Sequence, residues 1–281
     1  MSPIPFAKGE ALGNDYLVVR ADAIGADGAR AAGDPSRALS VDQCRALCDR
    51  HRGAGADGVL VVWPERSPIR LRIWNPDGSI AEKSGNGLRI AAAWLHHRGH
   101  VRTGEPFDVE LATDTVRMTV HGERDGERDV SVEMGRARFL ADEAGETLDV
   151  NGEGVTVHAV SLGNPHCVVI EKALDRSRFD RIGPRLEWHP RFPAGTNVQF
   201  AAARDRSSVE MLIHERGVGE TSASGSSSCA VAAVAKRLGL VDGPDVTVHM
   251  PGGALQVRVG PDYAVHLRGP ARLVYEGSFL V

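Results

Sequence analysis

Short hydrophobic stretches recur along most of the chain, and in many of them hydrophobic residues alternate with polar ones. This alternation has the period of a β-strand with one buried face. It predicts strands over Leu17–Val19, Val59–Trp63, Ile69–Trp74, two short segments within 107–120, Val130–Met134, Val155–Leu162, Cys167–Ile170, Asn197–Ala201, Ser208–Ile213, Val246–Met250, Ala254–Val259, Tyr263–Leu267 and Ala271–Phe279. The chain is therefore expected to consist mainly of strands.

Helix signals are fewer than strand signals. Three segments begin at a residue that caps helices well, and two of them are followed by a glycine that ends helices. We expect helices from Ser40 or Asp42 to about Arg50, from Ser84 to about Arg98 before Gly99, and from Ser226 or Ser227 to about Leu238 before Gly239. We expect Gly25–Pro35 to be a loop, and Pro184–Phe192 to be irregular or a short helix.

Two glycine-rich stretches, 75–87 and 215–226, have the same plan. Each runs from a strand end through a loop to a Ser-Gly pair, Ser84-Gly85 or Ser224-Gly225, and then into a helix. The first backbone N–H groups of a helix have no partner within the helix, so they form a natural site for an anion. Two such sites in one chain suggest that one anion is held between the two helix starts.

The two stretches belong to an internal duplication. An offset of 140 residues places Gly55 on Gly195, Ile73 on Ile213, Ser84 on Ser224, Gly85 on Gly225 and Gly99 on Gly239. An offset of 150 residues places Gly13-Asn14 on Gly163-Asn164. We therefore predict two similar domains, 1–125 and 126–269, related by a pseudo-two-fold axis. Equivalent loops would face one ligand in a cleft between the domains, with Ser84 and Ser224 on opposite sides of it.

Composition narrows the class of protein. The 281 residues are 42% hydrophobic and 25% charged, as in ordinary globular proteins, and the formal net charge is −4. The absence of a basic stripe argues against nucleic acid as a partner. We find no spanning hydrophobic run, no signal peptide, no cysteine or histidine pattern for zinc, and no cofactor motif. These features predict a cytoplasmic protein without membrane contact, metal or cofactor.

The polar residues of the two halves suit an α-amino acid as ligand. Glu215 and Arg216 offer a carboxylate and a guanidinium side by side, and the latter can grip a carboxylate with two hydrogen bonds. Amide side chains that could orient the ligand are those of Asn14, Asn75, Asn86, Asn164 and Asn197. Two groups that exchange protons on opposite faces of a Cα–H bond are what inversion of that carbon requires.

Several motifs resemble those of the diaminopimelate epimerase family, which belongs to the cofactor-independent amino acid racemases. The matching segments are Phe6-Ala7-Lys8-Gly9, Leu12-Gly13-Asn14-Asp15, Gly55-Ala56-Asp57-Gly58, Asn75-Pro76-Asp77-Gly78, Gly85-Asn86-Gly87-Leu88-Arg89, Gly163-Asn164-Pro165-His166, Asn197-Val198 and Glu215-Arg216-Gly217-Val218-Gly219-Glu220-Thr221. They span nearly the whole chain. The resemblance implies an α+β fold of two pseudo-symmetric domains, each a β-barrel-like sheet around a central helix. In that fold the final strand, here 270–281, returns to the first domain.

The resemblance also implies an activity and a site. The family is a homodimeric, cytoplasmic group of enzymes that convert LL- to meso-diaminopimelate for lysine and cell-wall synthesis. The residues that match its site for the distal, non-reacting end of the substrate are Asn14, Asn75, Asn164, Asn197, Glu215 and Arg216. The residues that match its site for the reacting α-carboxylate are Gly85, Asn86, Gly225 and Ser226.

The sequence departs from the family pattern at the reacting centre. Where the family has its two acid–base cysteines, this chain has Ser84 and Ser224. A hydroxyl is a weaker acid than a thiol and needs a neighbouring base, for which His166 is a candidate. Three interpretations follow: an epimerase with serine catalysts, a diverged racemase, isomerase or dehydratase acting on another amino acid, or an inactive amino acid-binding protein.

Overall fold

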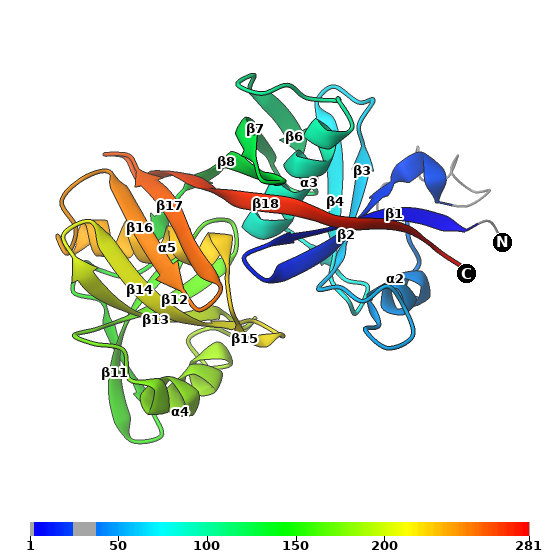
Figure 1. Ribbon diagram of the computed structural model, residues 1–281. Coiled ribbons are helices and arrows are strands. Elements are labelled where there is room, and N and C mark those ends of the chain that lie inside the picture. Colours follow the sequence, from blue (N-terminus) through cyan, green and yellow to red (C-terminus); the bar gives the residue numbers. More distant parts are fainter. Residues whose placement is uncertain (1–2, 25–37, 281) are drawn as a thin grey trace. The chain divides into compact units, whose positions relative to one another are not determined.

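The computed structural model describes residues 3–24 and 38–280, so the loop expected at Gly25–Pro35 lies outside the described residues. The chain divides into two compact units (Figure 1). Unit 1 comprises Met1–Val132 and Gly269–Val281, and unit 2 comprises Glu133–Arg268. Each unit contains a mixed sheet and a buried helix.

The elements follow one another in two series. Those of unit 1 are β1 (Ile4–Ala11), β2 (Asn14–Arg20), the 3₁₀ helix η1 (Ala21–Ala23), α2 (Val41–Cys48), β3 (Val59–Trp63), β4 (Ile69–Trp74), β5 (Ile80–Ala81), α3 (Gly85–His97), β6 (Phe107–Glu110) and β7 (Thr115–Arg124). β8 (Glu127–Arg136) leads into unit 2. There follow β9 (Arg138–Phe139), β10 (Glu146–Val150), β11 (Glu153–Ser161), β12 (Pro165–Glu171), α4 (Arg176–Glu187), β13 (Asn197–Asp205), β14 (Ser208–Glu215), β15 (Gly219–Thr221), α5 (Gly225–Arg237), β16 (Asp245–Met250), β17 (Gly253–Val259) and β18 (Ala264–Phe279).

Strand pairing is the same in both units. In unit 1, β2 runs parallel to β3, β3 and β5 flank β4 antiparallel to it, β4 runs parallel to β6, and β6 pairs antiparallel with β7. In unit 2 the same relations join β12 to β13, β14 to β13 and β15, β14 to β16, and β16 to β17. The helices α2 and α4 occupy equivalent crossovers between the parallel strands. The predicted pair of similar, sheet-dominated domains is confirmed.

Each unit is built around one helix that follows a Ser-Gly pair. Every residue of α3 from Gly85 to Leu95 is buried, and α3 packs on β1, β2, β3 and β7. Every residue of α5 from Gly225 to Ala235 is buried, and α5 packs on β11 to β14, β16 and β17. Small residues dominate α5 and form the run Ala91-Ala92-Ala93 in α3, and they let the strands approach closely. The central position fixes the start of each helix firmly.

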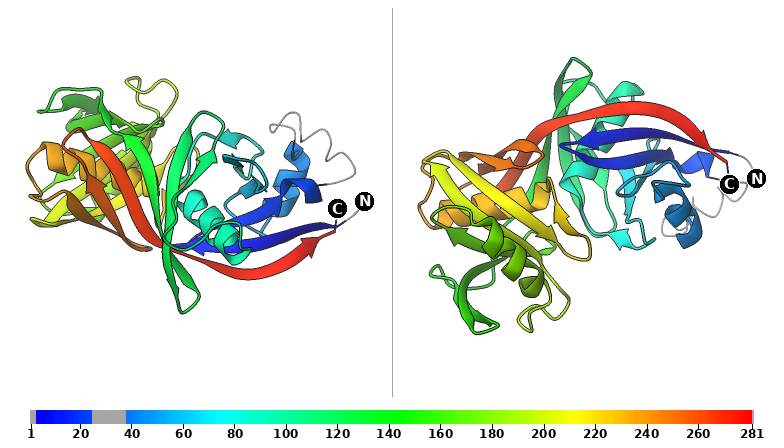
Figure 2. Two further views of the ribbon diagram at one scale, coloured as in Figure 1. Left: turned by 90° about the horizontal axis from the view of Figure 1, so that it is seen from above. Right: turned by 60° about the horizontal axis from the view of Figure 1, so that its bottom comes forward.

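Strand β18 returns to unit 1 at the end of the chain. It first pairs with β17, for instance Leu267 with Val257, and then with β1, for instance Phe279 with Ile4. Figure 2 shows β18 running alongside β1 in both views. The sequence predicts two strands here, separated near Gly269-Pro270, but the backbone stays extended through both residues. Proline fits because it occurs in strands where its missing N–H costs no ladder bond.

The predicted helix boundaries need two further corrections. Helix α4 runs over Arg176–Glu187, where the sequence predicts only an irregular segment or short helix from Pro184. Proline suggests a break, yet it is tolerated here near the end of a helix that Asp175 caps through the N–H of Arg178. Helix α5 begins at Gly225, one or two residues before the predicted start.

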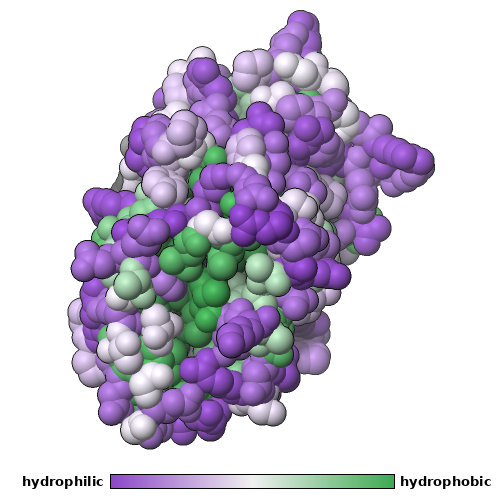
Figure 3. Space-filling view, turned by 90° about the vertical axis from the view of Figure 1, so that its left-hand side faces the viewer, coloured by the Kyte–Doolittle hydropathy of each residue, from purple (hydrophilic) through white to green (hydrophobic). Residues whose placement is uncertain are grey.

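Hydrophilic residues cover most of the face drawn in Figure 3, where they surround a patch of hydrophobic side chains. Buried hydrophobic side chains form the cores of the units, such as the cluster of unit 1 around Leu17, Val59 and Trp74. Among the residues that the structure describes, no helix is long and apolar enough to cross a membrane.

Candidate active site

The Ser84 site lies at the start of α3 in unit 1. Ser84 is the N-cap of the helix, as predicted, and its Oγ accepts a hydrogen bond from the backbone N–H of Gly87 at 3.1 Å. The same Oγ accepts a second hydrogen bond, at 3.2 Å, from the phenol of Tyr16 on β2. The Ser84 side chain is half-buried, so it remains open to a ligand.

Asn14 and Asn86 meet beside this helix start. The Asn86 amide donates to Oδ1 of Asn14 at 3.3 Å, and the Asn14 amide donates to Asp57 at 2.7 Å. Asn86 in turn accepts from the fully buried guanidinium of Arg89 at 2.8 Å. Since Asp57 takes its N–H, Asn14 presents its oxygen towards Asn86. The structure therefore brings Asn14, Gly85, Asn86 and Ser84 together.

A cluster of charges fixes Asp57. Arg50 bridges Asp15 and Asp57 at 2.8 and 2.6 Å, and Lys8 contacts Asp15 at 2.8 Å. Burial alone would raise the pKa of Asp15, but hydrogen bonds from Arg50 and Lys8 outweigh it and lower this pKa to about 2. Burial and the neighbouring Asp15 raise the pKa of Asp57. The cluster is balanced in charge and anchors Asn14.

Asn75 lies in a tight turn after β4. Its side chain donates to the hydroxyl of Ser79 at 3.0 Å, and its backbone oxygen accepts from Gly78 at 2.9 Å and from the Cys44 thiol at 3.1 Å. These contacts attach the turn to α2. Asn75 thus belongs to a different loop from Asn14 and Asn86.

The Ser224 site lies at the start of α5 in unit 2. Ser224 is again the N-cap, but its side chain makes no cap hydrogen bond. Instead its Oγ donates to Glu215 at 3.2 Å, and the other carboxylate oxygen of Glu215 accepts from the hydroxyl of Thr221 at 2.7 Å. The buried hydroxyl of Ser224 therefore has a carboxylate as its neighbour.

Asn164 is held beside the same helix start by a buried chain of hydrogen bonds. The Gln199 amide lies 3.0 Å from Ser227 Oγ and 3.2 Å from Nδ1 of His166, and Nε2 of His166 lies 3.0 Å from Oδ1 of Asn164. Complete burial and the charge of Arg216 lower the pKa of His166 to about 3. A neutral imidazole accepts at Nδ1 and donates at Nε2 in this setting.

This chain of bonds leaves the amide nitrogen of Asn164 free to turn towards α5. It donates to the Ser226 hydroxyl at 3.4 Å. Gly225, Ser226 and Asn164 are thus adjacent. His166, predicted as a possible auxiliary, contacts Asn164 and Gln199 in this arrangement.

Asn197 and Arg216 form the remaining part of the Ser224 site. Oδ1 of Asn197 accepts from the backbone N–H of Arg216 at 3.1 Å, and its amide donates to the backbone oxygen of Pro165 at 3.0 Å. Buried Glu187 holds the next peptide by accepting from Gly217 at 2.7 Å. The guanidinium of Arg216 donates to the backbone oxygen of Ala194 at 3.5 Å.

Sequence reasoning missed several polar residues that shape the two sites, namely Tyr16, Asp57, Thr221, Gln199 and Glu187. The duplication could have drawn attention to Tyr16, because the 150-residue offset pairs Tyr16 with His166, a candidate site residue. Asp57 and Thr221 lie inside motifs that the sequence singled out. For Gln199 and Glu187 we find no comparable signal.

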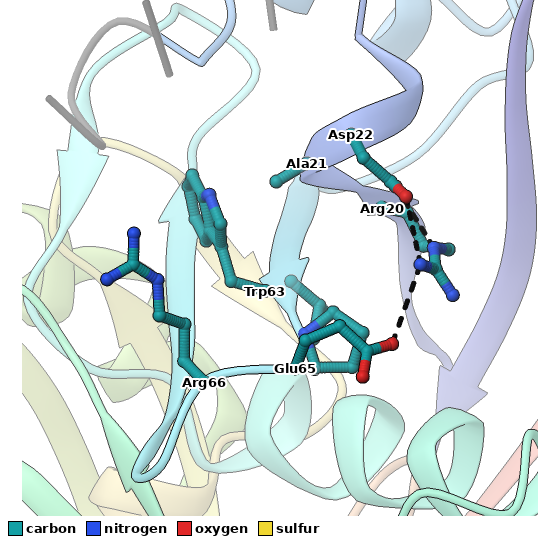
Figure 4. Close-up of a pocket in the computed structure, with 8 residues that line it drawn as sticks. Arg20, Ala21, Asp22, Trp63, Glu65 and Arg66 are labelled. Carbon is teal, nitrogen blue, oxygen red and sulfur yellow. Dashed lines mark hydrogen bonds and ion pairs between the residues drawn. The ribbon is translucent and has the colours of Figure 1, made fainter. Parts of the chain in front are cut away.

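The structure also contains a pocket in unit 1 that none of the predicted residues lines. It lies at the carboxyl ends of β2 and β3, where Trp63 and the pair Arg20–Asp22 face one another (Figure 4). Asn14 opens β2 at the opposite end of the strand. Among residues 3–24 and 38–280, no cluster of three or more His, Cys, Asp or Glu side chains is arranged to hold a metal ion.

Comparison with known proteins agrees with this architecture. The model of the family described as diaminopimelate epimerase matches residues 6–140 and 158–274. The chain belongs to the diaminopimelate epimerase family. The predicted family and the predicted class of enzyme, an epimerase or racemase, are confirmed.

Curated relatives match over most of their length. The chain is 39% identical to the diaminopimelate epimerase of Xylella fastidiosa over 291 residues, covering 98% of this chain and 96% of that protein. It is 38% identical to diaminopimelate epimerase 2 of Nostoc sp. over 266 residues, covering 90% and 88%.

Solved structures share the fold. A predicted epimerase from Pseudomonas aeruginosa has a TM-score of 0.72 at 19% identity, with 99% of each chain covered. A hydroxyproline epimerase from Agrobacterium vitis, with bound trans-4-hydroxy-L-proline, has a TM-score of 0.71 at 16% identity, covering 99% of this chain and 91% of that one.

Proposed function

We propose that this protein is a cofactor-independent epimerase that inverts the α-carbon of LL-diaminopimelate to give the meso form. One observation carries the proposal: Ser84 and Ser224 cap the buried central helices at equivalent positions of two equivalent units, in a chain of this family. The proposal includes a role in lysine and cell-wall synthesis and a homodimer, both on the basis of family membership.

Binding of the amino acid follows from the polar groups at each helix start. Backbone N–H groups at the helix starts, Gly85-Asn86 and Gly225-Ser226, suit the α-carboxylate of the reacting end. For the distal end, Arg216 and the amide of Asn164 offer donors to a carboxylate. Asn14, Asn75 and Asn197 would orient the remaining polar atoms.

Proton abstraction is assigned to Ser224 because a base lies beside it. As Cα–H breaks, its proton passes to Ser224 Oγ while the hydroxyl proton of Ser224 passes to Glu215, 3.2 Å away. The electron pair stays on the substrate as an enolate, which the helix N-terminus stabilises. Ser84 then delivers a proton to the other face of Cα. The neutral, buried His166 supports this site by orienting Asn164.

The proposal is tested by following exchange of the α-proton in D₂O by NMR, with LL- and with meso-diaminopimelate. We expect deuterium to enter Cα and each isomer to yield the other. Binding without exchange would contradict the epimerase and leave the inactive binder. Exchange without inversion would favour a one-base isomerase or dehydratase acting on another amino acid.

A second arm replaces both hydroxyls by thiols, as Ser84→Cys with Ser224→Cys. A thiol near a helix N-terminus ionises far more readily than a hydroxyl, so we expect the double variant to raise the rate of inversion at least tenfold. The matched control is Ser207→Cys in the exposed turn between β13 and β14, which should leave the rate unchanged. No gain in the double variant would show that the substrate is wrong.

A further inference from the structure

Ser84 has an unusual set of neighbours for a serine that must deliver a proton. Its Oγ accepts from two donors, the backbone N–H of Gly87 and the phenol of Tyr16, at 3.1 and 3.2 Å. A hydroxyl oxygen has two lone pairs, and both are engaged here. The hydroxyl proton of Ser84 is consequently left to point away from both donors, and any negative charge that forms on Oγ is stabilised by both.

The Tyr16 ring is held in place by tight packing. The Tyr16 side chain is only 6% exposed and lies on β2, two residues after Asn14. A Cβ at Gly58 would lie 2.6 Å from the ring, so a glycine at this position makes room for it. The ring cannot swing far, and its hydroxyl remains directed at Ser84.

Building on the proposed function, we propose that Tyr16 is a positioning residue that supplies protons to Ser84, so that the pair acts as one acid. Acid strength is the reason why this pairing would matter. A phenol has a pKa of about 10, close to that of a free thiol at about 8.5, whereas an aliphatic hydroxyl is a far weaker acid. Coupled to Tyr16, Ser84 gains an acid of nearly thiol strength at the position where the family has cysteine.

The proton transfers balance without any co-reactant. The Ser84 O–H bond breaks as a new Cα–H bond forms, and the electron pair of the enolate becomes that bond. The alkoxide left on Ser84 takes the proton of Tyr16, which becomes a phenolate. Water returns a proton to the phenolate when the product leaves. In the reverse reaction each transfer runs backwards.

The second unit shows that this contact is particular to Ser84. His166 occupies the position equivalent to Tyr16, two residues after Asn164, yet it contacts Asn164 and Gln199. Ser224 meets a carboxylate instead. The two sites thus differ in chemical character, with an acceptor beside Ser224 and a donor beside Ser84.

The test begins with Tyr16→Phe, which removes one oxygen and keeps the ring. We expect the rate of inversion to fall between tenfold and a hundredfold, while the Kd for diaminopimelate changes less than twofold. The descending limb of the pH–rate profile that ionisation of the phenol produces should disappear as well. Tyr275→Phe is the matched control, because its phenol belongs to the same unit and contacts the backbone of Ala54. An unchanged rate in Tyr16→Phe would overturn the proposal.

A double-mutant cycle that combines Tyr16→Phe with Ser84→Cys distinguishes a role of Tyr16 in supplying protons from a role in packing alone. A thiol ionises unaided, so Tyr16→Phe should cost less than threefold in the Ser84→Cys background. An equal loss in both backgrounds would mean that Tyr16 only supports the fold, and would also overturn the proposal.

A titration that needs no turnover distinguishes this proposal from the proposed function. The chain has three tyrosines, so their ionisation can be resolved by ultraviolet absorption. The midpoint of the phenol that is missing in Tyr16→Phe should move by at least half a pH unit in Ser84→Ala, since its hydrogen-bonding partner is gone. An unmoved midpoint would refute the Tyr16–Ser84 pair even in an active enzyme, and a shifted midpoint in an inactive protein would refute only the epimerase.

Discussion

At the scale of single residues, Ser84 and Ser224 occupy equivalent positions but have different partners. Ser84 Oγ accepts from Gly87 and Tyr16, whereas Ser224 Oγ donates to Glu215. The sequence predicts that Ser84 and Ser224 are equivalent, because the spacing of repeated residues reveals the duplication. The sequence does not predict their hydrogen-bond partners. Tyr16 and Ser84 are 68 residues apart, and only the packing of β2 against α3 brings them together.

Glu215 offers the most direct test at this scale. Glu215→Gln keeps the size of the side chain but removes the base beside Ser224. If the carboxylate accepts the Ser224 proton, the rate of α-proton exchange should fall by about 10²–10⁴. The measurement is deuterium incorporation at Cα under saturating diaminopimelate.

Glu220→Gln provides the control for this prediction. Glu220 lies on the neighbouring strand β15, but it is exposed and paired with Arg176 at 2.6 Å, a contact that contributes little. Its replacement should change the exchange rate less than twofold. Equal effects of the two replacements would show that Glu215 acts only through the local structure around β14 and β15.

At the scale of elements, the duplication predicts more than local signals do. The sequence around Pro184 suggests an irregular segment, yet an offset of 140 residues places α2, Val41–Cys48, on 181–188, which overlaps α4. Equivalence between the halves would have predicted this helix. Neither the local pattern nor the duplication predicts that β18 is a single strand, because only pairing with β17 and β1 holds its backbone extended through Pro270.

The cap of α3 allows a prediction about stability. Ser84→Ala removes the hydrogen bond from Gly87, and loss of this cap should contribute about 1 kcal/mol to the fall in the free energy of unfolding. In Ser84→Gly the change of cap should contribute only a few tenths of a kcal/mol, because glycine is itself tolerated as an N-cap. Both variants lose the Tyr16 contact equally, so urea denaturation of the two isolates the cap. Equal losses would show that capping is not what Ser84 contributes to α3.

At the scale of the whole molecule, the sequence predicts the repeated architecture well and the polar interior poorly. The two similar sheets and their central helices are predicted by the alternation of hydrophobic and polar residues, by the glycines that end helices and by the repeated Ser-Gly pairs. Buried Gln199 and His166 were not predicted as a unit, because their hydrogen bonds join β12, β13 and α5. Such contacts depend on tertiary packing, which no local pattern encodes.

The buried histidine couples this interior to the stability of the molecule. The pKa of His166 is about 3 in the folded chain, against about 6.5 for an unfolded histidine. Between these values the unfolded chain binds one more proton, so the contribution of His166 to stability is intact above pH 6.5 and is lost as the pH falls. From pH 6.5 to pH 5 this loss amounts to about 2 kcal/mol.

We therefore expect His166→Gln to flatten the decline in unfolding free energy between pH 7 and pH 5 by about 2 kcal/mol. The variant should be less stable than the original chain at pH 7, because the bonds to Asn164 and Gln199 are disturbed. Its deficit should then shrink on acidification, which a simple loss of packing would not cause. Urea denaturation at the two pH values, with the exposed His51→Gln as control, measures the difference. A deficit that stays constant with pH would show that His166 takes up its proton in the folded chain as readily as in the unfolded one.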